Sequence, residues 1–290
     1  MITLNHAEVH WNINRHCQYS CSYCHSGYKG GSIDHSLDKH LAVIEKLQAS
    51  RYKHHNSIYW KIGGGEPLHF SNLSTLFQKM KEHPCLIRLD TSGGSDWFSI
   101  LSVIKYVDII KLTVHEWQEP TQVEYIIDQC IENNIKLLII VPLLPDKIIE
   151  RRQLVEEYKN RGLRASEQIL QNESGGDWNG YSAFDISLIY GRPVDWSAPQ
   201  IDPTAPDPNY VDLSIVNNRD PVYTNSPCYA GVDWIHINQK GWPSYSQCRG
   251  RAESNNVFQD TWLPPDEHFP CNMNQCKSKQ DREKIRVIGS

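Results

Sequence analysis

The sequence has no long hydrophobic run and no strong excess of charge of either sign. Its longest apolar stretch, IKLLIIVPLL (135–144), is too short to span a bilayer, and Pro142 interrupts it. A net charge of −5 offers no broad basic surface, which argues against nucleic acid or an anionic membrane as a partner. The first residues also lack the charged and then apolar order of a signal peptide. We therefore expect a cytoplasmic protein.

Internal repeats and low-complexity tracts are missing too, but cysteine is abundant. A reducing cytosol does not maintain disulfides, so the nine cysteines need another explanation. Three of them lie close together at Cys17, Cys21 and Cys24. Clustered cysteines in a cytosolic chain are typical of metal binding, and we expect a metal centre at each of two clusters. The second cluster lies near the C-terminus and consists of Cys228, Cys248, Cys271 and Cys276.

Between residues 7 and 142, short strand-like runs alternate with helical patterns. Such alternation implies right-handed crossovers and a parallel sheet, closed or partly closed into a barrel. The sequence therefore predicts an α/β fold whose first part is a partial (β/α)6 barrel. The expected strands cover residues 8–14, 57–63, 86–91, 107–115, 135–141 and, more weakly, 166–172.

The regular alternation stops after residue 172. The next stretch is rich in Gly, Pro, Asp, Asn and Trp, which indicates a long irregular connection of the kind that forms lids or wraps between domains. Two strand-like runs then flank the turn NQKG and predict a β-hairpin with a cysteine at each end. We expect a barrel at 1–172, an irregular bridging or lid region at 173–227, a small C-terminal domain at 228–277 and a tail at 278–290.

Two motifs are expected at the same rim of this barrel. Ligands collect at the carboxyl ends of parallel strands, where the first cysteine cluster and the segment IGGGEP (62–67) both lie. Three thiolates suit an iron–sulfur cube with one iron left open; a zinc site completed by His16 or His25 is the alternative. Glycines let the backbone approach a ligand closely, and Glu66 supplies a carboxylate able to hold an ammonium group.

Together these motifs resemble those of the radical S-adenosylmethionine (SAM) superfamily, over roughly residues 8–145. Cys17, Cys21 and Cys24 match its cluster motif, with the aromatic Tyr23 before the third cysteine. The resemblance implies a [4Fe–4S] cluster whose open iron binds SAM. An electron from a donor such as flavodoxin or ferredoxin would cleave SAM to a 5′-deoxyadenosyl radical, which takes hydrogen from the substrate. The protein must orient these groups and exclude water.

The resemblance also implies contacts to SAM from the ends of the strands. A Gly-Gly-Glu motif would hold the amino group of SAM, and the turn after the third strand has serine in place of the usual asparagine. Polar residues that end the fourth strand would contact the ribose, and an apolar residue of the fifth would lie near adenine. The residues for the amino group are Gly64, Gly65 and Glu66, and the serine of the turn is Ser92. The ribose contacts are Thr113 and His115, and the residue near adenine is Val141.

The second cysteine group resembles the auxiliary-cluster extensions called SPASM and twitch domains. In these, a cysteine opens a hairpin, a glycine turns it and a second cysteine closes it. The spacing from Gly241 to the closing cysteine is longer than usual here, and the cysteines are too few for two auxiliary clusters. The resemblance implies one auxiliary [4Fe–4S] cluster that transfers electrons, with structural zinc as the alternative. Its ligands would be Cys228, Cys248, Cys271 and Cys276.

The sequence defines the chemistry more closely than the substrate. Enzymes with such extensions modify ribosomally made peptides or oxidise an alcohol on a small natural product. Few residues precede the first expected strand, so leader-peptide recognition would fall to a separate binding protein or to residues 173–227. We expect oxidation or cross-linking of a peptide. Dehydrogenation of a small sugar or aminocyclitol, and a non-catalytic zinc or electron-carrier module, are the alternatives.

Overall fold

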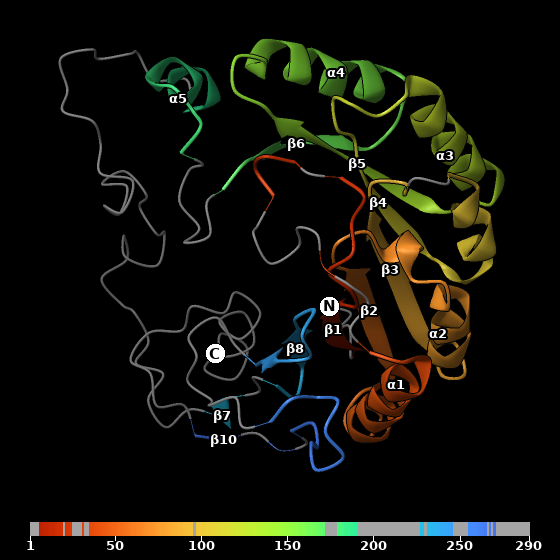
Figure 1. Ribbon diagram of the computed structural model, residues 1–290. Helices are drawn as coiled ribbons and strands as arrows, with labels where there is room; N and C mark the ends of the chain where they lie inside the picture. The colour runs from red at the N-terminus through yellow and green to blue at the C-terminus, as the bar shows by residue number, and fades with distance from the viewer. Residues whose placement is uncertain are drawn as a thin grey trace, which may run out of the picture.

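The computed structural model describes residues 6–19, 21–24, 31, 35–94, 97–171, 179–190, 227–228, 231–245, 255–265, 267 and 269–270. Its main feature is an eight-stranded sheet with the order β6-β5-β4-β3-β2-β1-β8-β9 (Figure 1). Neighbours from β1 to β6 are all parallel. These six strands are β1 (His6–Asn12), β2 (Ser57–Gly63), β3 (Cys85–Thr91), β4 (Ile109–Thr113), β5 (Lys136–Leu143) and β6 (Ala165–Ile169).

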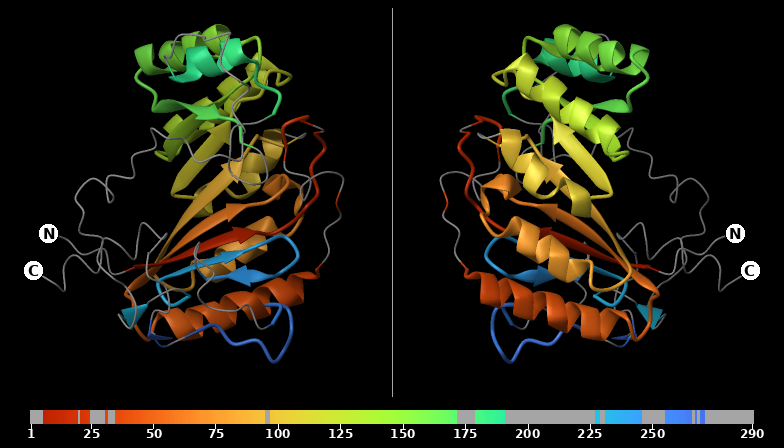
Figure 2. Two further views of the ribbon diagram at one scale, coloured as in Figure 1. Left: turned by 90° about the vertical axis from the view of Figure 1, so that its left-hand side faces the viewer. Right: turned by 90° about the vertical axis from the view of Figure 1, so that its right-hand side faces the viewer.

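Helices connect these strands and lie on one side of the curved sheet (Figure 1). Figure 2 shows α1 at one end of the row of strands and α4 with α5 at the other. The predicted partial (β/α)6 barrel is confirmed, although the crossover from β3 to β4 uses short 3₁₀ helices. The helices are α1 (Leu37–Arg51), η2 (Pro67–His69), α2 (Leu73–Met80), η3 (Trp97–Ser102), η4 (Ile104–Tyr106), α3 (Pro120–Glu132), α4 (Ile148–Asn160) and α5 (Ala183–Tyr190).

Alternate residues of each strand face opposite sides of the sheet. One set is apolar and forms the buried core with the helices; Trp11, Trp60 and Leu112 belong to it. The other set is half-buried and largely polar, on the side without helices. We call this second side the polar sheet face. It consists of Glu8, His10, Asn12, Tyr59, Lys61, Arg88, Asp90, Lys111 and Thr113.

Helix α5 lies inside the stretch predicted to be irregular, so that prediction is wrong for these residues. Its start is a reciprocal cap: Ser182 N donates to Asp185 Oδ2 at 2.9 Å, and Asp185 N donates to Ser182 Oγ at 3.1 Å. Arg152 of α4 donates to the carbonyl oxygens of Leu188 and Ile189. The helix is therefore capped locally and attached to the barrel.

The predicted C-terminal hairpin is confirmed as β8 (Trp234–Ile237) and β9 (Pro243–Ser244), which pair antiparallel. Gly241 turns it with φ +82°, and a Cβ there would collide with the ring of Phe258. Strand β8 also pairs in parallel with β1, so the hairpin extends the barrel sheet. A separate two-stranded sheet joins β7 (Pro227–Cys228) to β10 (Phe269–Pro270). The proposed domain boundaries stay predictions.

The end of α1 holds the C-terminal part of the chain. Arg51 is fully buried and donates to the carbonyl oxygens of Gly231 and, at 2.6 Å, Pro265. Close by, His55 Nε2 lies 3.0 Å from Asp233 Oδ1. The two bonds of Arg51 join segments 180 and 214 residues apart in sequence. In the described part of the chain, no helix combines the length and the apolar character that a membrane span requires.

Candidate active site at the carboxyl ends of the strands

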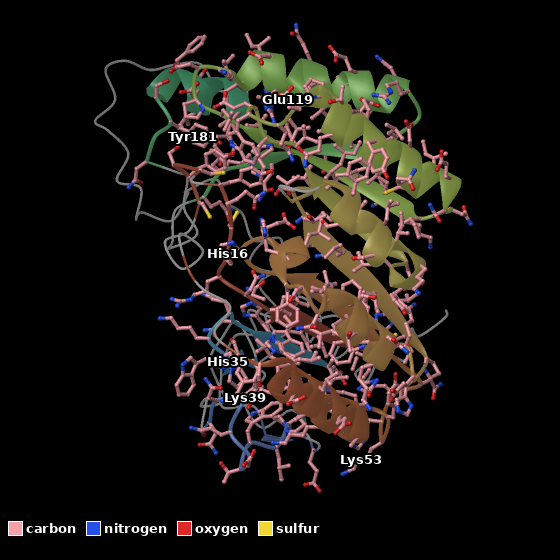
Figure 3. The ribbon with its side chains drawn as sticks, turned by 45° about the vertical axis from the view of Figure 1, so that its right-hand side comes forward. His16, His35, Lys39, Lys53, Glu119 and Tyr181 are labelled. Carbon is pink, nitrogen blue, oxygen red and sulfur yellow. The ribbon has the colours of Figure 1, made fainter. Side chains whose placement is uncertain are left out.

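The cysteine loop follows β1, at the carboxyl edge of the parallel strands. Cys17, Cys21 and Cys24 are half-buried and free of disulfides, and Cys24 N donates to Cys21 O at 3.1 Å in a tight turn. Burial raises the pKa of Cys17 to about 11, and negative charge on Glu66 and the other two cysteines adds to the increase. A bound cation would remove this penalty on the thiolate. His16, at the start of the loop, is labelled in Figure 3.

The Gly-Gly-Glu motif packs directly against the base of the cysteine loop. Gly65 N donates to Asn14 O at 3.0 Å, and Glu66 N donates to His16 O at 2.7 Å. Gly64 has φ +141°, and a Cβ there would lie 2.7 Å from Asn14 O; a Cβ on Gly65 would collide with the backbone of His16. Both positions therefore require glycine. These glycines therefore let the turn after β2 lie close to the backbone of the cysteine loop.

The Glu66 side chain joins the ends of β2 and β3. It is 1% exposed, and its Oε1 accepts hydrogen bonds from Thr91 Oγ1 at 2.6 Å and from Leu68 N at 3.1 Å. Its Oε2 accepts from Ser92 N at 2.9 Å and from Ser92 Oγ at 2.7 Å. A carboxylate has about four acceptor positions, and these bonds use them. Binding of an ammonium group, as predicted for Glu66, would require one of these bonds to be exchanged.

A second layer of contacts links Ser92 to the loop after β4. The Gln118 amide donates to Ser92 O and accepts from His115 N. Gln118 is buried, so it fixes the two loops relative to each other. Sequence pattern did not single out Gln118, because an isolated glutamine after a strand has no distinguishing pattern, and it included Thr91 only as part of the turn that contains Ser92.

Aromatic side chains connect the cysteine loop to the same β4 loop. Tyr23 Oη lies 2.6 Å from His115 Nδ1, and the His115 ring stacks on Trp117 with centroids 4.8 Å apart. Tyr19 packs against Trp117 at 3.6 Å. Burial and the positive charge of Arg151 lower the pKa of His115 to about 4, so its imidazole is neutral at pH 7. The structure thus brings together Tyr23 and His115, two residues predicted to bind SAM.

The remaining predicted contacts of the barrel divide between the two faces of the sheet. Thr113 ends β4 and belongs to the polar sheet face. Val141 is fully buried in the core on the helix side, with Ile139 and Ile127. It does not join the other predicted residues, and the prediction that it lies beside adenine is not supported by this position.

The second cysteine group lies almost wholly outside the described residues. The backbone of Cys228 pairs with Phe269 across β7 and β10, whereas its side chain and Cys248, Cys271 and Cys276 fall outside them. The auxiliary cluster therefore stays a prediction. Among the described residues, Cys17, Cys21 and Cys24 included, no three His, Cys, Asp or Glu side chains are arranged to hold one metal ion, so the cluster at the first cysteine group also stays a prediction.

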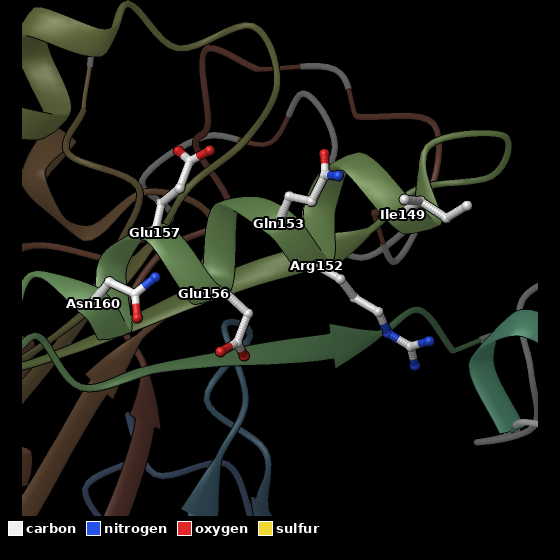
Figure 4. A pocket seen from close by; sticks show the side chains of 6 residues that line it. All are labelled: Ile149, Arg152, Gln153, Glu156, Glu157 and Asn160. Atoms are coloured by element: carbon white, nitrogen blue, oxygen red, sulfur yellow. The ribbon is translucent and has the colours of Figure 1, made fainter.

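An open depression on the outside of the barrel runs along α4 (Figure 4). It contains none of the predicted site residues. Its Arg152 side chain is bound to Glu167 at 2.8 Å and to the end of α5. We interpret this depression as a by-product of helix packing. It is lined by Ile149, Arg152, Gln153, Glu156, Glu157 and Asn160.

Comparison with protein-family models and with curated proteins finds no match for this chain. Among solved structures, the chain is similar to SuiB of Streptococcus suis (TM-score 0.40, 11% identity, 88% of this chain and 64% of SuiB). SuiB bound to the precursor peptide SuiA gives similar values (0.39, 12%, 88% and 63%). BtrN in complex with AdoMet and 2-DOIA gives 0.43 and 12%, covering 87% and 78%. The chain thus spans less than two thirds of SuiB, and these TM-scores do not define a family.

Proposed function

We propose that this chain is a radical SAM enzyme that holds a [4Fe–4S] cluster through Cys17, Cys21 and Cys24. The observation that carries the proposal is the packing of the Cys-x3-Cys-x2-Cys loop on the Gly-Gly-Glu motif, through backbone bonds that both Gly64 and Gly65 make possible. When bound, the cluster would supply the electron that cleaves SAM and starts hydrogen abstraction from a substrate. The donor set fits, because thiolates from one short loop are the usual ligands of such clusters.

The surrounding residues would position SAM and keep the site dry. Glu66 and Gln118 fix three strand ends relative to one another. The contact between Tyr23 and His115 anchors the cysteine loop to β4. Because the pKa of His115 is lowered by burial, this contact adds no positive charge at pH 7 beside a group that must bind a sulfonium cation.

The substrate we propose is a ribosomally made peptide, which the enzyme oxidises or cross-links. Dehydrogenation of a small hydroxylated metabolite is the second candidate, and the polar sheet face favours it. Lysine, arginine and aspartate side chains there suit a small ligand rich in hydrogen-bonding groups. In both cases an electron would leave the substrate for the auxiliary cluster predicted at the second cysteine group.

Anaerobic reconstitution tests the chemistry without knowledge of the substrate. The wild-type chain is expected to bind about eight irons in two clusters and to form 5′-deoxyadenosine from SAM under reducing conditions. Cys17→Ala should lose about half of the iron and all SAM cleavage. Cys85→Ala is the matched control, because Cys85 lies at the start of β3, away from the carboxyl edge, and its thiol donates to Met80 O. SAM cleavage by the Cys17 variant at the wild-type rate would contradict the proposal.

A further inference from the structure

The polar sheet face carries a row of basic side chains in register. On adjacent strands, His236 of β8 lies opposite His10 of β1, which lies opposite Lys61 of β2, which in turn lies opposite Arg88 of β3. Lys111 of β4 lies on the same face, opposite Asp90. Strands of a parallel sheet that is covered on both sides are usually apolar throughout. The charged side chains on this face therefore have to be balanced by other charged groups, because an apolar core cannot balance them.

Part of this charge is neutralised within the face. Glu8 Oε2 accepts from Lys61 at 2.6 Å and lies 3.0 Å from His10 Nε2. Burial by itself would raise the pKa of Glu8, but the bonds and charges of His10 and Lys61 outweigh it and lower that pKa to about 2. Glu8 is therefore ionised at pH 7 and satisfies the charge of Lys61.

The second carboxylate of this face, Asp90, forms an ion pair with Arg88. Asp90 accepts two bonds from Arg88, at 2.7 Å to Oδ1 and 2.9 Å to Oδ2. This bidentate geometry is the strong form of an arginine–carboxylate pair. Lys111 Nζ lies 3.8 Å from Asp90 Oδ2, beyond hydrogen-bonding distance. Among the described residues, this face holds Lys61, Arg88 and Lys111 against two carboxylates, Glu8 and Asp90, and Lys111 carries the surplus positive charge.

The place of Lys111 along its strand puts this charge near the candidate active site. Lys111 lies two residues before Thr113, the last residue of β4 at the carboxyl edge. A ligand group at Lys111 would therefore lie just below the edge where the cysteine loop begins.

We propose that Lys111 binds a carboxylate group of the substrate on the polar sheet face. This rests on the proposed function, since it names the substrate class of the same enzyme. A single surplus charge in a half-buried setting matches a single negative charge. A phosphate monoester carries nearly two negative charges at pH 7, and the neighbouring carboxylate Asp90 would repel the excess. Acidic peptides and small hydroxylated acids share the required group.

Calorimetric titration of the full-length chain tests this without SAM and without turnover. The probes are the blocked peptide acetyl-Gly-Glu-Gly-amide, its glutamine counterpart, 3-hydroxybutyrate and inorganic phosphate. We expect the glutamyl peptide or 3-hydroxybutyrate to bind, and Lys111→Met to weaken that binding about tenfold, as loss of a charge-assisted bond predicts. Lys111→Arg should retain most of it. Tighter binding of the glutamyl peptide would identify a peptide as the substrate. Tighter binding of 3-hydroxybutyrate would identify a small metabolite.

The control is Lys159→Met, which removes an exposed lysine of α4 that pairs with Glu156. Its binding should equal that of the wild type. Thermal unfolding of both variants shows that each is folded. Equal binding of the glutamyl and glutaminyl peptides, unchanged binding by Lys111→Met, or tighter binding of phosphate than of either carboxylate would overturn the proposal. Such a result would leave SAM cleavage by the cysteine loop unaffected, so the two proposals fail separately.

Discussion

Glu66 is expected to bind a cofactor, but in this structure its side chain stabilises the fold. Its carboxylate accepts four hydrogen bonds, two of them from the buried Ser92. The motif after β2 indicated a special role for Glu66, but spacing could not show that three of its four hydrogen bonds come from Thr91 and Ser92 at the end of β3. That information depends on which strands are neighbours.

Glu66→Gln is expected to destabilise the chain by about 2 kcal/mol. An amide group offers one oxygen acceptor, so its NH2 would face a backbone N–H of Leu68 or Ser92 and leave it unsatisfied. Urea unfolding measures the change. Glu82→Gln, which alters an exposed pair with Lys79, is the control and should change stability by less than about 0.5 kcal/mol. Equal effects of both substitutions would show that the buried bonds contribute little.

His236 makes stability depend on pH. Burial, and then the charge of His10, lower the pKa of His236 to about 4 from 6.5, and Asn12 Nδ2 lies 3.0 Å from its Nε2. Between these pH values the unfolded chain binds a proton that the native state does not. Stability is therefore complete above pH 6.5 and falls as the pH is lowered toward 4, by at most about 3 kcal/mol from this group.

The measurement is the free energy of unfolding of the wild type and of His236→Gln between pH 7 and 4. The glutamine oxygen can still accept from Asn12 but cannot be protonated in this range. The variant should lose less stability than the wild type over the interval. Identical pH dependence of the two proteins would mean that His236 titrates normally in the native state.

At the scale of elements, helix α1 connects the barrel to the C-terminal hairpin. The fully buried Arg51 at its end donates to Gly231 O and Pro265 O. Helical periodicity predicted the apolar face of α1 but gave no reason to expect a buried arginine. A single charged residue in a helix is usually exposed, and only the distant carbonyl groups explain its position.

Arg51→Met is expected to destabilise the chain by about 3 kcal/mol, since two buried carbonyl groups lose charged donors. Hydrogen exchange should increase most in β8 and in residues 255–265, before the parallel strands open. Arg161→Met is the matched control, because Arg161 forms an exposed pair with Glu124 worth less than about 1 kcal/mol. Uniform exchange across the sheet in the Arg51 variant would contradict a specific attachment of the hairpin.

At the scale of the whole molecule, local pattern predicted the order of strands and helices, and the cysteine and Gly-Gly-Glu motifs predicted which edge carries the site. Three features could not be predicted this way. The pairing of β8 with β1 joins residues 8–11 to 234–237, the Glu8–Lys61 charge pair of the polar sheet face joins β1 to β2, and Val141 lies on the helix side because of strand register. Each depends on contacts distant in sequence, for which periodicity contains no information.

The predicted auxiliary cluster would also be a property of the whole molecule, since its predicted ligands come from well separated parts of the C-terminal region. Strand pairing sets Cys228 opposite Phe269, two positions before Cys271 in the sequence. Cys271→Ala is expected to lose about four irons and to retain SAM cleavage while product formation stops. The substrate would still lose hydrogen, but the second electron of the oxidation would have no acceptor. Iron content, 5′-deoxyadenosine and product are measured together, with Cys85→Ala as control. Product at the normal rate in the Cys271 variant would show that oxidation does not pass through this site.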